Sequence, residues 1–85
     1  MNKYYITPCN QGLLVFQSIE NGYKLVSKFF LEGIEQALQK LNTNTVYMFE
    51  CDFKTDYDLF VKQYLEARGI QVIIEKEVNK DEIFN

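Results

Sequence analysis

The feature that most constrains the fold is an unbroken apolar run, Val46, Tyr47, Met48 and Phe49, between two helical patterns. Consecutive apolar residues leave neither face of a strand polar, which is typical of a strand buried on both sides. The flanking segments 31–41 and 57–68 repeat apolar residues at spacings of three and four, as amphipathic helices do. Residues 45–52 are therefore predicted to form the central strand of one small sheet.

Signals at both ends of the second helical segment are clear. Thr55 precedes it, and Asp58 lies three residues later, as in a capping box. Arg68 and Gly69 supply the cation and the glycine that commonly end a helix. These signals predict a helix that begins just after Thr55 and ends just before Gly69.

The first thirty residues predict three strands, because turn residues separate three apolar segments. The predicted strands cover residues 3–7, 13–19 and 23–30. The second turn contains Asn21 and Gly22, a pair typical of a type I′ hairpin, in which both central residues have positive φ. With these two residues as the loop, Phe16 should face Ser27.

This register sorts the hairpin side chains onto two faces. The face with Phe16 and Tyr23 is mainly aromatic and apolar, so we expect it to point to the helices. The other face mixes aliphatic side chains with two lysines and a glutamine, and we expect it to stay uncovered and to bind a partner. This candidate interface comprises Leu13, Val15, Gln17, Ile19, Lys24, Val26, Lys28 and Phe30. Because Tyr4 and Tyr5 point to opposite faces, we also expect one of them to be exposed or at an interface.

The element order is β-β-β-α-β-α-β, with a last strand at about 70–76. If the first three strands form an antiparallel meander, right-handed crossovers can place the fourth strand beside the first. We therefore predict an α+β domain with a mixed sheet of order 3-2-1-4-5 and both helices on one face. The single domain spans 1–85, with an ordered core at about 3–76 and a loose tail at 79–85.

Composition and charge argue against several classes of protein. The 85 residues are 47% hydrophobic and 25% charged, which is typical of one globular domain. A net charge of −3 and a pI of about 4.8 argue against nucleic acid binding, which needs a basic surface. No signal-peptide pattern and no apolar run near the roughly 20 residues of a membrane span occur in the sequence. Two cysteines are too few for a disulfide framework, so we expect a cytoplasmic protein with reduced thiols and no membrane partner.

The predicted element order resembles the ribonuclease H-like fold over about residues 3–76. Enzymes of that family carry an Asp on the first strand, a Glu in the first helix and an Asp at the end of the fourth strand, which together hold two divalent metals. Glu32 matches the helix Glu and Asp52 matches the fourth-strand Asp, whereas the first strand contains no acid. The resemblance therefore implies the fold, but leaves the acids for two-metal catalysis incomplete.

Other candidate chemistry is sparse. The chain has no His, no Cys-x-x-Cys and no glycine-rich phosphate loop. Glu32, Glu50 and Asp52 are the weak candidates for a metal site, and no cofactor is expected. Because ligands of open sheets bind beyond the carboxyl ends of strands, Glu50 and Asp52 should lie beside residues 7–9.

Three functional hypotheses agree with the sequence. We expect a non-enzymatic protein–protein interaction module that self-associates through the helix-free sheet face or an edge strand. Small size, acidity and an abundance of residues with AT-rich codons favour a phage or mobile-element accessory or inhibitor protein. The alternative is a degenerate ribonuclease H-like domain that binds nucleic acid or nucleotide without cleavage, through Lys24, Lys28 and neighbouring aromatics. The third is a small metal-dependent hydrolase.

Overall fold

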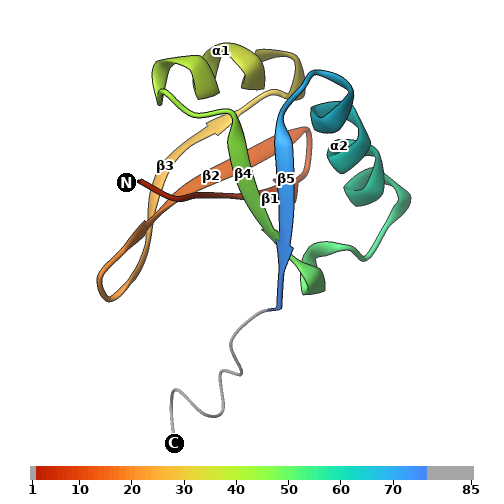
Figure 1. The fold of residues 1–85 in the computed structure, drawn as a ribbon. Coiled ribbons are helices and arrows are strands. Elements are labelled where there is room, and N and C mark those ends of the chain that lie inside the picture. Colours follow the sequence, from red (N-terminus) through yellow and green to blue (C-terminus); the bar gives the residue numbers. More distant parts are fainter. Residues whose placement is uncertain (1, 77–85) are drawn as a thin grey trace, which may run out of the picture.

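The computed structural model describes residues 2–76 and confirms the predicted α+β domain, with five strands in the order β3-β2-β1-β4-β5 (Figure 1). The strands are β1 (Tyr4–Cys9), β2 (Gly12–Ile19), β3 (Gly22–Phe29), β4 (Thr45–Phe49) and β5 (Gln71–Glu75). The first three form an antiparallel meander, whereas β4 pairs in parallel with both β1 and β5. The first strand of the chain therefore lies at the centre of the sheet. The predicted loose tail at 79–85 lies outside the described residues.

Helical segments occupy the two crossovers. They are η1 (Leu31–Gly33), α1 (Ile34–Lys40), η2 (Glu50–Asp52) and α2 (Asp56–Ala67), where η denotes a 3-10 helix. The predicted helix at 31–41 is divided because no side chain caps its first turn and Gly33 is a weak helix former. The strand predicted at 45–52 is β4, which lies next to the central β1 rather than at the centre. It is shorter than predicted, because the chain turns into η2 directly after Phe49.

The predicted capping box at the start of α2 is confirmed. Thr55 Oγ1 accepts a hydrogen bond from the Asp58 backbone N–H at 3.3 Å, and Asp58 Oδ2 accepts one from the Thr55 N–H at 2.9 Å. The Asp58 carboxylate also accepts a bond from the Lys54 N–H at 2.9 Å. These bonds satisfy backbone donors that the first turn of a helix leaves without partners. Asp58 therefore has a structural role, although it is a buried acid.

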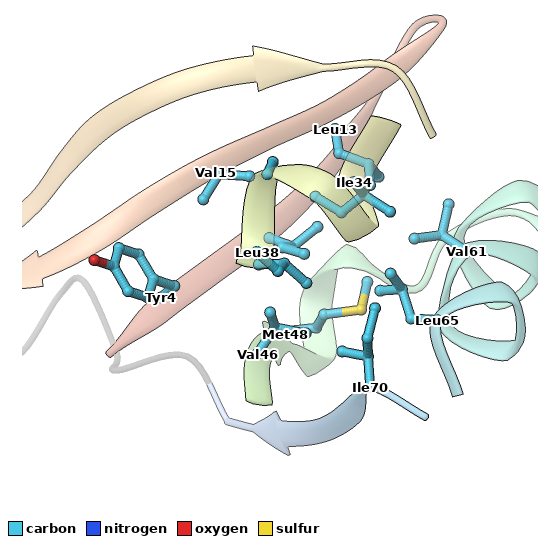
Figure 2. Close-up of a cluster of buried hydrophobic side chains, with 12 residues drawn as sticks. Tyr4, Leu13, Val15, Ile34, Leu38, Val46, Met48, Val61, Leu65 and Ile70 are labelled. Atoms are coloured by element: carbon cyan, nitrogen blue, oxygen red, sulfur yellow. The ribbon is translucent and has the colours of Figure 1, made fainter. Parts of the chain in front are cut away.

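Both helices pack on the same face of the sheet. Figure 2 shows side chains of the strands and of the helices pointing toward one another in one apolar layer. This core comprises Tyr4, Ile6, Leu13, Val15, Ile34, Ala37, Leu38, Val46, Met48, Val61, Leu65 and Ile70. Because side chains alternate along each strand, the residues between these point to the opposite side. No helix of the described chain covers that side, which we call the helix-free face.

The structure overturns the predicted register of the second hairpin. Its loop consists of Glu20 and Asn21 instead of the predicted Asn21 and Gly22, so Ile19 pairs with Gly22. Within this turn the positive φ falls on Gly22, at 150°, a conformation that other residues rarely adopt. This loop already sets Phe16 opposite Leu25 rather than the predicted Ser27. Beyond that pair Val26 is an extra residue of β3, a bulge that sets Val15 opposite Ser27.

The predicted side of each hairpin face, toward the helices or away from them, is also wrong. Leu13 and Val15, expected to be uncovered, are 0% exposed in the core beneath the helices. The cause is the first turn, where Cys9 pairs with Gly12 and thereby sets Val15 opposite the buried Ile6. Most of the remaining members of the predicted interface also lie away from the helix-free face. Gln17, Ile19 and Lys24 lie on the helix side. Val26 is at the bulge and Phe30 follows β3, whereas Lys28 is on the helix-free face.

Candidate functional site

The helix-free face carries four aromatic side chains in mutual contact, Tyr5, Tyr23, Tyr47 and Phe49, which we call the aromatic cluster. Tyr5 stacks on Phe49 with ring centroids 4.9 Å apart, and it contacts Tyr47 at 5.4 Å. The edge of Tyr23 meets Tyr5 at 5.0 Å and Phe49 at 5.7 Å. Separations and angles of this kind are favourable for aromatic pairs. The cluster therefore forms a second, smaller apolar layer on the side of the sheet that lacks helices.

The contact between Tyr23 and Phe49 shows that the sheet curls over this face. Tyr23 belongs to β3 and Phe49 to β4, and two strands lie between them in the sheet. Their rings can meet only if sheet twist carries the two strands toward each other above β1. As a result Tyr5 is only 4% exposed, and Tyr4 on the core side is 5% exposed. Of the two alternatives expected for this pair, exposure is therefore wrong for both tyrosines, and a place at an interface stays a prediction.

A polar network closes one side of the aromatic cluster. The Tyr5 hydroxyl donates to Glu75 Oε1 at 2.8 Å, and Lys3 Nζ donates to Glu75 Oε2 at 2.7 Å. The Lys3 ammonium also lies 4.3 Å from the ring centroid of Tyr47, a cation–π contact. This Lys3–Glu75–Tyr5 network links β5 to β1 and to the residue before it. Its one positive and one negative charge compensate each other.

Each group of the network has a shifted pKa with a clear physical cause. The hydrogen bond from Lys3 lowers the pKa of Glu75, and the hydrogen bond to Glu75 raises the pKa of Lys3. Burial raises the pKa of Tyr5, and its bond to the Glu75 carboxylate acts in the same direction. The neutral phenol and the ion pair are therefore the stable forms near neutral pH.

Acid should weaken this network, and Glu75→Gln should remove the effect. Because folding lowers the pKa of Glu75, its contribution is complete above the ordinary value of 4.5 and is lost as pH falls through the lower folded value. Urea midpoints at pH 7 and pH 3 should therefore differ less in Glu75→Gln than in the unaltered protein. Glu66→Gln is the control, because its ion pair with Lys62 lies on an exposed helix surface. If the urea midpoint fell equally between pH 7 and pH 3 in the unaltered protein and in Glu75→Gln, the acid sensitivity would not come from Glu75.

Of the two acids predicted to lie beside residues 7–9, Asp52 lies there. Thr7 Oγ1 donates to Asp52 Oδ2 at 3.3 Å, which places Asp52 beside the end of β1. Glu50 is exposed at the start of η2, and Glu32 is exposed in η1. Within residues 2–76 no three His, Cys, Asp or Glu side chains are grouped so that they could hold a metal ion. The structure thus brings Asp52 to Thr7, but does not assemble Glu32, Glu50 and Asp52 into one metal site.

Hollows lie at both ends of the sheet. One of about 750 Å³ lies at the amino ends of β1, β4 and β5 and is lined largely by neutral amides and hydroxyls, among them Asn42, Thr43 and Gln71. A smaller one of about 370 Å³ lies between the end of β1 and the start of α2 and is lined in part by Cys9 and Tyr57. Burial raises the pKa of Tyr57, whose hydroxyl donates to the Gly12 carbonyl at 3.3 Å. This tyrosine therefore ties α2 to the sheet.

Exposed apolar side chains gather on the second hairpin. Of the nine large hydrophobic residues that are exposed in the described chain, five lie on or beside β2 and β3: Ile19, Tyr23, Leu25, Val26 and Phe30. Tyr23 and Leu25 project from β3 on the helix-free face and are 49% and 52% exposed. They lie on the β3 side of the nearly buried Tyr5. The candidate binding surface is therefore the aromatic cluster extended by Leu25, rather than the predicted Leu13 and Val15.

Sequence reasoning missed the aromatic cluster because its members come from three strands that are distant in the sequence. A usable signal was present at the first turn: a two-residue loop at Asn10 and Gln11 pairs Tyr5 with Phe16 and so puts both on the side opposite Ile6. The contact of Tyr23 with Phe49 has no comparable signal, because it depends on the curl of the whole sheet.

Comparisons with other proteins add no relationship to this picture. No protein-family model, curated protein or solved structure matches the chain. Among the helices of residues 2–76, none combines the length and the apolar character that crossing a bilayer requires. The functional assignment therefore depends on the surface of the molecule.

Proposed function

We propose that this protein is a non-enzymatic protein–protein interaction module that self-associates through its helix-free face. The observation that carries the proposal is the half-exposed pair Tyr23 and Leu25 beside the buried Tyr5, on a sheet face without a helix. Because each side chain is already about half covered, complete burial of one stabilises a complex by roughly half of the 1.5–3 kcal/mol of a fully exposed side chain. A second copy of the face would cover both residues in each protomer.

The dimensions of the face agree with a reversible dimer. Its strands have five to eight residues, and strands rise about 3.3 Å per residue and lie about 4.8 Å apart. These values give a face of about 500 Å² per copy, so two stacked faces bury about 1,000 Å². That area lies near the lower limit of specific interfaces. We therefore expect a dissociation constant on the order of micromolar rather than a permanent dimer.

Charge placement favours the face over an edge as the self-association surface. On the face, the charges of Lys3 and Glu75 are paired at 2.7 Å, so they do not repel a second copy, and Lys28 adds one charge at the outer strand. The outer strand β3 instead carries Lys24, Lys28 and a bulge at Val26. Edge lysines and bulges are features by which proteins prevent edge-to-edge pairing with their own kind. Sheet-on-sheet packing is therefore the favoured arrangement.

Leu25→Asp should abolish self-association and leave the monomer folded, because it places a charge in the exposed apolar part of the proposed interface and 52% of Leu25 is exposed in the monomer. Sedimentation velocity between 5 and 300 μM, about the range set by a micromolar constant, would measure the monomer–dimer equilibrium. Far-ultraviolet circular dichroism would confirm that the variant is folded.

Ile19→Asp is the matched control for this experiment. Ile19 lies on the same hairpin and is 47% exposed, but it projects to the helix side of the sheet. This variant should dimerise as the unaltered protein does. A monomer throughout the concentration range, or equal loss in Leu25→Asp and Ile19→Asp, would count against the helix-free face as the interface.

A further inference from the structure

The outer edge of β3 is open along its whole length. β3 is the terminal strand of the described sheet, spans eight residues and pairs with β2 alone. Every residue from 23 to 28 is exposed, so neither helices nor loops of the described chain cover this edge. Alternate backbone N–H and C=O groups of such a strand point away from its neighbour and can accept an additional strand.

The opposite edge of the sheet, formed by β5, is less suited to accept an additional strand. β5 has only five residues. Exposed and half-buried residues are mixed along 71–76, whereas β3 is exposed without interruption from 23 to 28. Glu75 at its end is held by Lys3 and Tyr5. The longer and fully exposed β3 is therefore the edge that can receive another strand.

The charge of β3 differs in sign from that of the whole chain. The net charge of the protein is −3, yet the two charged residues of β3 are Lys24 and Lys28. Neither lysine has an ion pair among those formed by the described residues. Pairing of β3 with a second β3 would gather four lysines in one two-stranded ribbon, which like-charge repulsion disfavours. An acidic strand would instead be attracted to this edge.

We infer that the β3 edge binds an extended acidic segment of another protein, which joins the sheet as an additional strand. This interaction uses the backbone edge of β3, whereas the proposed self-association uses the sheet face that adjoins this edge at Tyr23, Leu25 and Lys28, and it does not depend on that self-association. Main-chain hydrogen bonds would supply affinity, and carboxylates facing Lys24 and Lys28 would select the acidic partner. Tyr23 and Leu25 border this edge on the helix-free side.

The bulge predicts how the acids of the partner are spaced. Lys24 pairs with Gln17, which is on the helix side, whereas Lys28 pairs with Leu14, which is on the helix-free side. The two lysines thus project to opposite faces although they are four positions apart, because Val26 is the extra residue. On a regular partner strand, side chains that point to opposite faces are an odd number of positions apart. Two acids about three positions apart would therefore meet one lysine each.

A nucleic acid fits this edge less well than an acidic strand. Two lysines on opposite faces of one strand cannot follow a single phosphate backbone, and nucleic acid sites need a clustered basic surface. A phosphate chain also cannot continue the ladder of main-chain hydrogen bonds that an edge strand offers. Binding of a single-stranded oligonucleotide through the same lysines is therefore an outcome that would overturn the inference.

The test uses a fluorescein-labelled peptide, Thr-Val-Glu-Thr-Val-Glu-Thr, and its counterpart with both Glu replaced by Gln. Fluorescence anisotropy with the full chain at low salt should show binding of the acidic peptide and at least tenfold weaker binding of the Gln peptide. The double variant Lys24→Glu plus Lys28→Glu should also bind the acidic peptide at least tenfold more weakly. Lys40→Glu plus Lys62→Glu, which changes the net charge equally on the helices, should bind it as the unaltered protein does.

Hydrogen exchange locates the bound peptide. Backbone amides of residues 23–28 should exchange more slowly in the presence of the acidic peptide, while those of β5 should be unchanged. The inference is overturned by no binding at millimolar protein, by equal loss in the two double variants, by protection elsewhere than β3, or by preferred binding of an oligothymidylate. Sedimentation of the same samples distinguishes the two proposals. A protein that dimerises but does not bind the peptide supports the proposed function and refutes this inference alone.

Discussion

Val15→Asp should unfold the protein at room temperature. Val15 is 0% exposed and lies in the core with Leu13 and Ile34, where a carboxylate would have no polar partner among the apolar side chains. An unpaired buried charge and the lost packing together cost roughly 4 kcal/mol or more, which is a large part of the total stability of a small domain. Far-ultraviolet circular dichroism and urea denaturation should show loss of the folded state.

Leu25→Asp is the comparison variant for Val15→Asp. It makes the same kind of change on the neighbouring strand at a residue that is 52% exposed, so the monomer should remain folded. The predicted assignment of the face with Phe16 and Tyr23 to the helix side requires the opposite behaviour, since it leaves Val15 uncovered and buries Leu25. A folded Val15→Asp protein together with an unfolded Leu25→Asp protein would therefore restore the predicted assignment of the faces and refute the observed one.

Tyr5→Ala should be the most damaging truncation on the helix-free face. Tyr5 is 4% exposed and contacts all three other rings of the aromatic cluster. Removal of a buried aromatic side chain typically costs about 3–5 kcal/mol. Tyr5→Phe, which keeps the ring and removes only the hydrogen bond to Glu75, should cost about 1 kcal/mol.

Urea midpoints at one fixed protein concentration would compare these two variants, since self-association couples stability to concentration. Tyr23→Ala is the control, because its ring belongs to the same cluster but is 49% exposed and should cost less than Tyr5→Ala. Equal losses in Tyr5→Ala and Tyr5→Phe would mean that the hydroxyl, rather than the ring stack, holds this side of the sheet together.

The element order and the strand order could be predicted because the sequence marks them locally. Thr55, Asp58 and Gly69 delimit α2, and the chirality of crossovers restricts the order of strands once the meander is recognised. The faces of β2 could not be predicted from its own residues, because positions 13–16 are all apolar and do not alternate. The pairing of β2 with β1 decides them, and the turn at residues 10 and 11 fixes that pairing.

The candidate site was harder to predict than the fold. Tyr5, Tyr47 and Phe49 could have been grouped once β1 was placed beside β4, since they point to the same side of neighbouring strands. The approach of Tyr23 depends on sheet curl, which no short pattern encodes. The Lys3–Glu75 ion pair joins residues 72 positions apart, so it too follows only from the assembled sheet.

The central position of β1 also has a consequence for biosynthesis. Protein synthesis proceeds from the amino terminus, so the meander is complete before the helices that cover it have been made. Until residues 34–65 follow, Ile6, Leu13 and Val15 have no helix above them, and β1 lacks its β4 neighbour. The nascent chain thus presents two open edges and a bare apolar surface. Lys24, Lys28 and the bulge on β3 protect one of those edges while the chain is still unfinished.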